Sequence, residues 1–437
     1  MEKGLVSVDQ WTVEGQAYFL THLHADHTRG LSAAWRRGPL FCSPISARLF
    51  PAKFPGFDLS LLRVLEVGAT RALDLVSPTT GSRVQILVTP IDAHHCPGAV
   101  MYLFHGAFGL VLYTGDFRWE SSSKRAELAK KMLLDALQGN TVDVLYMDNT
   151  YCHPSLSFPP RHVAAQQVID IITMHPDHEI IIGIDNLGKE DLLVHISKAL
   201  CTKVWVWPER LQTMHLLGYD NIFTTNTSVT RVRAVPRYSL TFETLDALNT
   251  MHPTIGILPS GLPWALDLSK KKGFLCTLSE KNHSYEGSVN QLHKNQMHLT
   301  RKLKQNAYSV PYSEHSCFSE IEEFVKLVQP SILSRIVPST FCYINPRYYF
   351  SRYCIDIHPS DEPSSSKSDK AEDVDTNEKN GTLQRCKSFI KVKARELRKA
   401  KYARGKLGIR SRTYALLKTK RGAKIMDTDE MVLNSSL

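Results

Sequence analysis

Four potential metal ligands lie within six residues, in the segment 22–27 with the sequence HLHADH, directly after an apolar, strand-like run. Alternate residues of an extended segment point to the same side, so His22 and His24 can reach one metal ion. The turn that follows directs Asp26 and His27 towards a second point nearby. Imidazole and carboxylate groups are ligands that zinc and similar divalent ions prefer. The segment therefore predicts ligands for two metal ions, as in two-metal phosphodiester chemistry; a polar loop with incidental histidines is the alternative.

Four further candidates stand alone, each after an apolar strand-like segment; they are His95, Asp116, Asp148 and His315. Gly115 would let the backbone approach closely beside Asp116. Taken singly, a carboxylate at a strand end is usually a turn residue or a helix cap. Taken together with the histidine-rich segment, their order along a strand-rich chain favours a complete metal site.

The predicted secondary structure that must hold these residues differs between parts of the chain. The first 115 residues predict short strands and turns with little helix. From about residue 156 helices and strands alternate, which is typical of an α/β layer with parallel strand pairing. Near residue 309 the pattern of the first 115 residues returns. The expected elements are strands at 5–8, 84–88, 101–104 and 110–113, a helix at 126–137, a strand at 144–147, a helix at 163–172, a strand at 180–184, a helix at 190–200, a strand at 204–207, a helix at 208–217, a strand at 254–258, a strand and turn at 309–315, a helix at 321–328 and a strand at 334–337.

Length and composition are those of a globular chain. With 437 residues it can form two or three domains around a sizeable core. We expect no signal peptide, and no apolar run approaches the roughly 20 residues that a membrane span needs. The nine cysteines are odd in number and include no Cys-x-x-Cys pair, which favours a reducing compartment over a disulfide framework.

The net charge of +10 is concentrated near the C-terminus. Residues 387–424 contain 15 Lys or Arg and one acidic residue, whereas residues 1–360 contain 34 basic and 32 acidic residues. Residues 359–386, rich in Ser, Asp, Glu and Lys, predict a disordered linker. Residues 387–404 favour a helix whose apolar face is too thin to need a core. This distribution indicates an arm for nucleic-acid binding or nuclear import, with a solvated charged helix as the alternative.

The histidine-rich segment 22–27, followed along the chain by His95 and Asp116, resembles the metal-binding pattern of the metallo-β-lactamase superfamily. Asp148, His315 and the α/β segment between them narrow the resemblance to the β-CASP nucleases. Further segments resemble the DNA-repair branch that includes Artemis and Apollo, with the Apollo group the most similar. They are residues 21–30, 40–45, 95–101, 113–118, 148–152, 188–190, 252–255 and 312–320. The resemblance spans about residues 5–340 and does not cover the tail.

The resemblance implies an α/β fold, in which a metallo-β-lactamase αββα sandwich carries an inserted α/β β-CASP domain and a disordered basic C-terminal tail. Residues 263–306 are polar, basic and weakly patterned, and we expect a loop or a variable excursion there. The expected boundaries are 1–155 for the first part of the metallo-β-lactamase domain, 156–306 for the insertion, 307–358 for the return segment, 359–386 for the linker and 387–437 for the basic tail.

The resemblance also implies roles for the candidate residues. Those expected to bind one or two zinc ions are His22, His24, Asp26, His27, His95 and Asp116. Those expected to be catalytic are Asp26, Asp116, Asp148 and His315. In this scheme Asp116 bridges two ions and His315 assists departure of the leaving oxygen. Asp9 would orient the histidine loop from outside the ligand set.

The third β-CASP motif separates DNA enzymes from RNA enzymes in this family. RNA-processing members have another metal-ligand histidine about twenty residues beyond the second motif, whereas DNA members have valine. Residues 334–338 read SRIVP in this chain, and no histidine occurs between His315 and His358. The resemblance therefore implies DNA as the substrate.

A phosphate pocket is expected where Lys189 follows Gly188 at a helix start, because free N–H groups there could bind a terminal phosphate. An ordinary helix start is an equal alternative. Ser339 and Thr340 could serve the same pocket. The relatives usually have a serine at the position of Asn186, which is a departure from the pattern.

We therefore expect a zinc-dependent 5′-to-3′ DNA exonuclease in DNA repair, processing interstrand crosslinks or double-strand breaks, with telomere maintenance as a second setting. The expected partners are DNA that is single-stranded or has a free 5′ phosphate, together with repair or telomere proteins. We expect no membrane association and a nuclear location. The alternatives are an RNA-cleaving β-CASP ribonuclease and a non-catalytic adaptor. The missing third-motif histidine argues against the first, and the full ligand set against the second.

Truncation after about residue 360 should weaken DNA affinity at low salt and flatten its salt dependence, because each phosphate neutralised by the tail releases counterions. Turnover on a short saturating substrate should stay almost unchanged, since every expected metal ligand precedes the truncation. Affinities of both chains at three salt concentrations measure the effect. An unchanged salt slope would rule out a DNA-binding arm, and a joint loss of thermal stability and activity would indicate that the tail completes the fold.

Overall fold

The structure, a computed structural model, describes residues 1–261, 300–337 and 345–355 and the backbone of two short strands near the C-terminus. The chain divides into two units, Met1–Asp356 and Ile357–Leu437. In the second unit β18 (Ala415–Thr419) pairs with β19 (Gly422–Met426) in an antiparallel hairpin. The linker expected at 359–386 and the helix expected at 387–404 lie outside the described residues, as do residues 263–299 of the expected loop.

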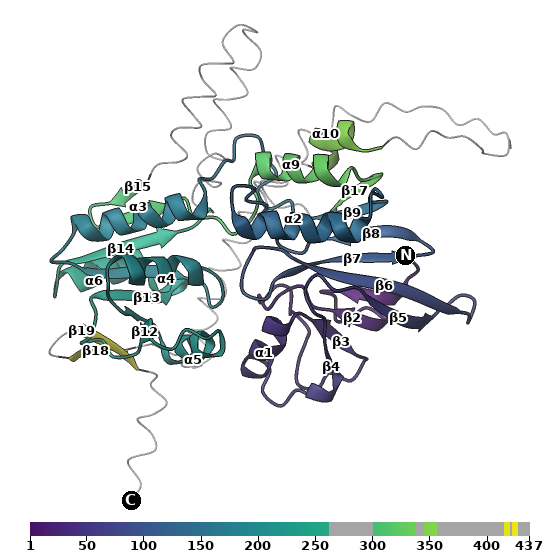
Figure 1. Ribbon diagram of the computed structural model, residues 1–437. Coiled ribbons are helices and arrows are strands. Elements are labelled where there is room, and N and C mark those ends of the chain that lie inside the picture. The colour runs from purple at the N-terminus through teal and green to yellow at the C-terminus, as the bar shows by residue number, and fades with distance from the viewer. Residues whose placement is uncertain (262–299, 338–344, 356–414, 420–421, 427–437) are drawn as a thin grey trace, which may run out of the picture. The chain divides into compact units, whose positions relative to one another are not determined.

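Two sheets of the first unit lie face to face (Figure 1). The four-stranded sheet is parallel, with the order β1 (Gly4–Val8), β2 (Gly15–Phe19), β3 (Leu40–Cys42), β4 (Leu62–Val64). The six-stranded sheet has the order β17 (Ile332–Arg335), β9 (Val144–Met147), β8 (Gly109–Tyr113), β7 (Val100–Gly106), β6 (Arg83–Asp92), β5 (Arg71–Val76). Strands β5 to β8 pair antiparallel, and β8, β9 and β17 pair parallel.

Aromatic side chains fill the space between these two sheets. Phe19 of β2 stacks on Phe41 of β3 with ring centroids 4.9 Å apart. It also meets Tyr102 and Phe104 of β7 edge-on, at 5.2 and 5.1 Å. Because successive residues of a strand point to opposite faces, the intervening Leu103 of β7 faces away from this core. Both faces of β7 are thus buried, which explains its continuous apolar sequence.

Helices cover the outer faces of both sheets. Two of them, α2 (Lys124–Leu137) and α9 (Phe318–Val328), lie along the six-stranded sheet (Figure 1), and their Leu133 and Phe324 join Leu103 in one core. Helix α1 (Pro44–Lys53) packs on the four-stranded sheet, where its Phe50 shares a core with Leu40 of β3. The sequence pattern predicted α2 and α9 but not α1, although a capping serine followed by proline is a helix-start signal.

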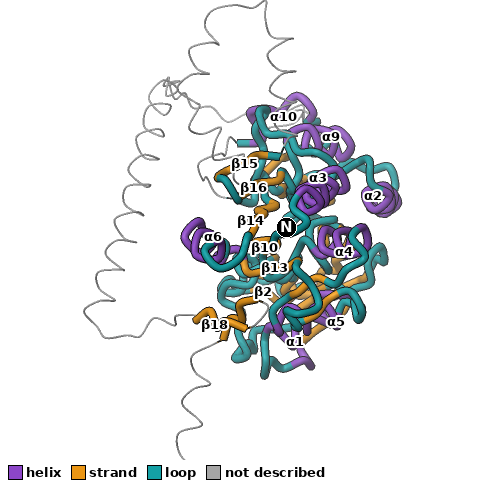
Figure 2. Tube along the Cα trace, turned by 90° about the vertical axis from the view of Figure 1, so that its left-hand side faces the viewer, coloured by secondary structure: helices purple, strands orange, loops and turns teal. Residues whose placement is uncertain are grey.

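The third sheet forms the expected α/β layer. Its order is β12 (Phe223–Thr224), β11 (Val204–Trp205), β13 (Val232–Pro236), β10 (Glu179–Ile184), β14 (Thr254–Pro259), β16 (Ala307–Val310), β15 (Arg301–Lys304). All pairs are parallel except β15 with β16, which confirms the predicted pairing. Helices α3 (Arg161–Met174) and α4 (Glu190–Ala199) lie on one face and α6 (Phe242–Asn249) on the other (Figure 2). The next helix, α5 (Pro208–Leu216), follows β11. The mixed α/β class is therefore confirmed.

Several expected boundaries differ in the structure. Strand β16 pairs with β14, so a boundary between residues 306 and 307 cuts through the third sheet. Strand β15 lies within the segment expected to be a loop. The strand expected at 204–207 ends at Trp205, and the one expected at 334–337 runs from Ile332 to Arg335. Strand β13 was not predicted, because Arg233, its second residue, interrupts the apolar run. In the fold Arg233 is buried, with its guanidinium group 2.9 Å from the carboxylate of Glu179.

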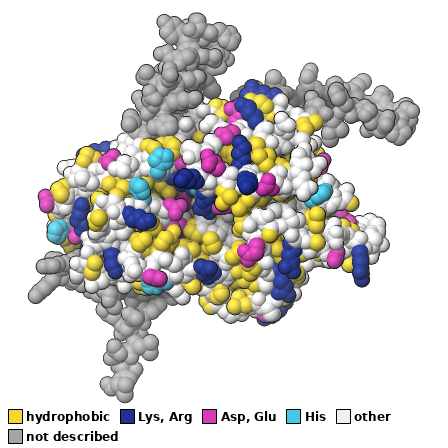
Figure 3. Space-filling view, viewed as in Figure 1, with side chains coloured by type: hydrophobic (Ala, Val, Ile, Leu, Met, Phe, Trp, Pro, Cys, Tyr) yellow, Lys and Arg dark blue, Asp and Glu magenta, His cyan; other side chains and the backbone are white. Residues whose placement is uncertain are grey.

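The surface of the described part carries mixed charge. On the face shown in Figure 3, basic and acidic side chains are interspersed and no sign dominates. This agrees with the near balance of acids and bases in residues 1–360. Among the described helices, none combines the length and apolar character needed to cross a membrane.

Replacing Phe19 by alanine should lower the free energy of unfolding by about 3–5 kcal/mol, because it removes a buried ring from between the two sheets and leaves a cavity. Urea denaturation measures the change. Leu128→Ala, at a position of α2 whose side chain is 55% exposed, is the control and should stay within about 0.5 kcal/mol of the unsubstituted chain. Equal losses for both variants would contradict this account of the core.

Candidate metal centre

The histidine-rich loop follows the end of β2, and hydrogen bonds with the carboxylate of Asp9 fix its position. The Asp9 carboxylate accepts hydrogen bonds from the Thr21 backbone N–H at 2.9 Å and from the Thr21 hydroxyl at 2.6 Å. The Thr21 carbonyl accepts from the Val100 N–H at 3.0 Å, which ties the loop to β7. Gly115 lies against this turn, and a Cβ there would lie 2.8 Å from the Cβ of Thr21. The close backbone approach predicted at Gly115 is therefore present.

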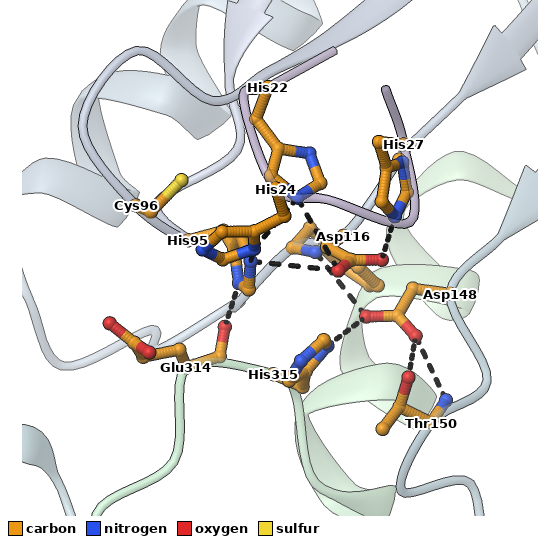
Figure 4. Close-up of polar contacts among 12 residues, drawn as sticks. His22, His24, His27, His95, Cys96, Asp116, Asp148, Thr150, Glu314 and His315 are labelled. Carbon is orange, nitrogen blue, oxygen red and sulfur yellow. Dashed lines mark hydrogen bonds and ion pairs between the residues drawn. The ribbon is translucent and has the colours of Figure 1, made fainter. Parts of the chain in front are cut away.

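Three imidazole rings converge at the end of this loop (Figure 4). The Nδ1 atom of His24 lies 3.0 Å from Nε2 of His22 and 3.1 Å from Nε2 of His95. Oδ2 of Asp116, at the end of β8, lies 3.6 Å from the Nε2 atoms of both His22 and His95. The structure thus brings three of the six predicted metal ligands together, with a fourth, Asp116, beside two of them.

Backbone carbonyls fix the tautomers of two of these rings. Nε2–H of His24 donates to the carbonyl oxygen of Leu187 at 3.0 Å. Nδ1–H of His95 donates to the carbonyl oxygen of Glu314 at 2.8 Å. In the neutral form of each ring, the nitrogen that faces the cluster therefore carries the lone pair.

The third ring, His22, is oriented by the hydroxyl of Thr21, 3.0 Å from its Nδ1. Because that hydroxyl donates its proton to Asp9, it accepts the Nδ1–H of His22, and Nε2 is left as a lone pair. Burial lowers the pKa values of His22 and His95 well below 6.5, and the neighbouring rings lower them further. With all three rings neutral, three nitrogen lone pairs face this point, an arrangement that a bound cation would satisfy.

These four atoms have the spacing of a zinc site. A tetrahedral zinc ion with bonds of about 2.0–2.1 Å has ligand atoms about 3.3 Å apart. The contacts of His24 with His22 and His95, and of Asp116 with the same two rings, measure 3.0–3.6 Å. Cys96 lies close enough to join the three histidines as a fourth donor. Burial raises the pKa of its thiol well above 9, so Asp116, which is an anion, is the better fourth ligand.

A second group surrounds His27. Its Nε2 lies 3.2 Å from Oδ1 of Asp116 and its Nδ1 lies 2.7 Å from Oδ2 of Asp9. Burial disfavours a charge on this ring, but the carboxylates of Asp116 and Asp9 raise its pKa to about 12. A metal ion at this position would therefore displace a proton. The predicted partner Asp26 is 71% exposed, with its carboxylate 3.8 Å from Nε2 of His27, and stands apart from the close group of His22, His27 and Asp116.

His315 lies beside the first group but binds a different carboxylate. Its Nδ1 donates to Oδ2 of Asp148 at 2.8 Å, and its ring centroid is 4.7 Å from that of His95. The other oxygen of Asp148 accepts from the N–H and hydroxyl of Thr150. Burial opposes protonation of His315, but Asp148 and Asp116 raise its pKa to about 9. Asp148 therefore acts through His315, which holds a proton at neutral pH.

The phosphate pocket expected at Lys189 is not supported. The ammonium group of Lys189 is buried and forms ion pairs with Glu314 at 2.8 Å and with Asp185 at 3.1 Å. Both carboxylates neutralise it, so it is not free to bind a phosphate. Ser339 and Thr340 lie outside the described residues.

Residues that contact the ligand side chains were mostly missed by sequence reasoning. Thr21 and Glu314 each directly precede a predicted histidine, which is the only local signal they carry. The carbonyl of Leu187 has no side-chain signal at all. Arg118, two residues after Asp116, is fully buried and donates to the carbonyl of Ser313 at 2.6 Å, which holds the loop before His315.

Comparison with known proteins places this geometry in a family. The family model described as DNA repair metallo-beta-lactamase matches residues 219–343. The 5' exonuclease Apollo of Gallus gallus is 38% identical over 350 residues, which cover 79% of this chain and 65% of that protein. The DNA cross-link repair protein SNM1 of Arabidopsis thaliana is 33% identical over 74% of this chain and 60% of that protein. The DNA cross-link repair 1A protein of Homo sapiens is 30% identical over 75% of this chain and 28% of that protein.

This chain spans less than two thirds of the length of these curated relatives. Identity of 30–38% nevertheless extends over about three quarters of this chain. The family predicted from the order of the histidines and aspartates is confirmed. The chain belongs to the DNA repair metallo-beta-lactamase family, in the branch that includes Apollo.

Proposed function

We propose that this chain is a zinc-dependent nuclease that hydrolyses DNA phosphodiester bonds from a 5′ end. The observation that carries the proposal is the convergence of three imidazole rings and a carboxylate: Nδ1 of His24 lies 3.0–3.1 Å from Nε2 of His22 and of His95, and Oδ2 of Asp116 lies 3.6 Å from those same two Nε2 atoms. Such a donor set has no function without a cation. The Apollo relatives are named 5' exonucleases, which supports the same chemistry and polarity here.

The first zinc ion would be held by His22, His24, His95 and Asp116, and a second by His27, Asp116 and Asp26. Bound zinc lowers the pKa of a coordinated water to about 7 and neutralises charge on phosphoryl oxygens. The two oxygens of Asp116 face different groups, Oδ2 towards His22 and His95 and Oδ1 towards His27. This division supports a bridging role for Asp116.

His315 is the proposed donor of a proton to the leaving oxygen. Its Nδ1 is bound to Asp148, so Nε2 is the nitrogen available to substrate. Asp148 keeps the ring protonated and in one orientation, which makes it a positioning residue. Asp9 has the corresponding role for His27 and the histidine-rich loop.

The domain arrangement proposed here is a metallo-β-lactamase αββα sandwich with a β-CASP insertion. The face-to-face sheets with outer helices support the sandwich, and the third sheet between Asp148 and His315 supports the insertion. We propose that the insertion extends to Val310, the end of β16. The basic tail at 387–437 is proposed as a further DNA-binding segment.

DNA is the proposed substrate because residues 334–338 lack the additional histidine of RNA-processing relatives. A role in repair of DNA crosslinks agrees with the names of the relatives, which are DNA cross-link repair proteins. We propose double-strand-break processing and a nuclear location from the family resemblance alone. The test is digestion of matched DNA and RNA strands, with and without a 5′ phosphate, alongside zinc analysis. Preferential digestion of 5′-phosphorylated DNA is expected. Faster cleavage of RNA would favour a ribonuclease, and absence of cleavage by the zinc-loaded chain would favour an adaptor.

Asp116→Ala should abolish DNA cleavage and leave the fold largely intact, because this carboxylate faces both ligand groups. Cleavage, zinc content and the thermal midpoint should be measured together. Asp135→Ala, at an exposed position of α2, is the matched control and should retain activity. Near-normal cleavage by a folded, zinc-loaded Asp116→Ala chain would refute the assignment.

His315→Ala should slow turnover more than it weakens zinc binding, because three other histidines already form the first group. General acid catalysis contributes about 10²–10⁴-fold to the rate, which sets the expected loss. Single-turnover rates and chelator competition separate the two effects. Loss of all zinc from this variant would mean that His315 is itself a ligand.

A further inference from the structure

We infer that the buried ion pair between Lys189 and Glu314 positions the metal-binding histidines His24 and His95. It does so by holding together the two backbone segments whose carbonyls accept hydrogen bonds from those rings. This inference rests on the proposed metal centre and adds residues to it that touch no metal ligand through their own side chains. Lys189 and Glu314 are thus positioning residues.

Two contacts join the segments directly. The Glu314 carboxylate accepts from the backbone N–H of Lys189 at 2.7 Å and from its ammonium group at 2.8 Å. The carbonyl of Leu187, two residues before Lys189, accepts from His24, and the carbonyl of Glu314 itself accepts from His95. One ion pair therefore sets the distance between the two carbonyls that select the tautomers of the two rings.

The backbone of the Leu187 segment adopts a costly conformation to make these contacts. Lys189 has φ +64°, a left-handed and unfavourable conformation that an L-residue rarely adopts. The preceding Gly188 has φ +102°, and a Cβ there would lie 2.5 Å from Oε1 of Glu314. Such strain persists only where surrounding contacts hold it, and the pair with Glu314 provides them.

A second buried ion pair, between Glu190 and Arg210, also holds the turn between β10 and α4. Oε1 of Glu190 accepts from the backbone N–H of Gly188 at 3.0 Å and lies 2.8 Å from Nη2 of Arg210. Arg210, on α5, is fully buried and also donates to the carbonyls of Asn186 and Gly188. The carbonyl of Leu187 lies between these two anchored residues, so its direction towards His24 is fixed from both sides.

The arrangement makes the metal centre depend on the third sheet. Leu187 lies in the turn between β10 and α4, and Glu314 lies in the segment that follows β16. His24 and His95 come from the two-sheet part of the unit. Because a ligand stabilises the state that binds it, metal binding and the docking of these turns should stabilise each other. An ion pair that only braces the fold would show no such coupling.

The test uses Lys189→Met and Glu314→Gln in the full chain. Lys189→Met removes the ammonium group, and Glu314→Gln keeps the shape but removes the charge. Arg233→Met is the matched control: it removes a buried cation 2.9 Å from the carboxylate of Glu179, and no contact described for it reaches Leu187 or Glu314. Zinc affinity by chelator competition, the visible absorption of the cobalt(II) form and the thermal midpoint are measured for each.

Loss of an orienting partner typically weakens metal binding about 10–100-fold. Both test variants should show a loss of this size and altered cobalt bands, whereas Arg233→Met should lower only the thermal midpoint. Wild-type zinc affinity and cobalt bands in Glu314→Gln would overturn the inference, whatever the stability of that variant, and this milder variant decides if Lys189→Met fails to fold. Failure of the unsubstituted chain to bind zinc would instead overturn the metal centre itself.

Discussion

The mutual approach of three imidazole lone pairs is the constraint on which the rest of the site depends. Nδ1 of His24 lies 3.0 Å from Nε2 of His22 and 3.1 Å from Nε2 of His95, and the lone pairs of the neutral rings repel one another unless a cation lies among them. Their outward nitrogens are all committed to hydrogen bonds, so the rings cannot turn away without breaking a buried contact. The surrounding fold therefore holds the three rings in an arrangement that favours a bound metal ion.

Three layers of the fold contribute to this geometry. The end of β2 carries the histidine-rich loop, the end of β8 carries Asp116, and turns of the third sheet supply carbonyls. Buried carboxylates complete each connection: Asp9 to the loop, Asp148 to His315, and Glu314 to Lys189. Buried charges of this kind require partners, and each carboxylate here has one or more. The site is thus assembled from both parts of the first unit.

Sequence reasoning found the ligands because imidazole and carboxylate side chains after strands are visible as residue types. His22, His24, His95 and Asp116 follow apolar runs whose period is easily read, and the structure brings them together. It did not find the backbone carbonyl of Leu187, because a carbonyl is common to all residues and only tertiary structure selects one. It assigned Lys189 to phosphate, since a lysine at a helix start carries no sign of a carboxylate 125 residues away. Likewise, α1 and β13 were missed because Pro51 and Arg233 interrupt their apolar patterns.

The central claim is that three histidine nitrogens and a carboxylate bind one zinc ion in this chain. Zinc K-edge X-ray absorption of the loaded protein tests it most directly, because it reports the ligand atoms independently of activity. The account predicts nitrogen and oxygen ligands at about 2.0–2.1 Å, with the outer-shell scattering of three imidazole rings. Sulfur scattering at about 2.3 Å would contradict it, because it would make Cys96 a ligand in place of Asp116.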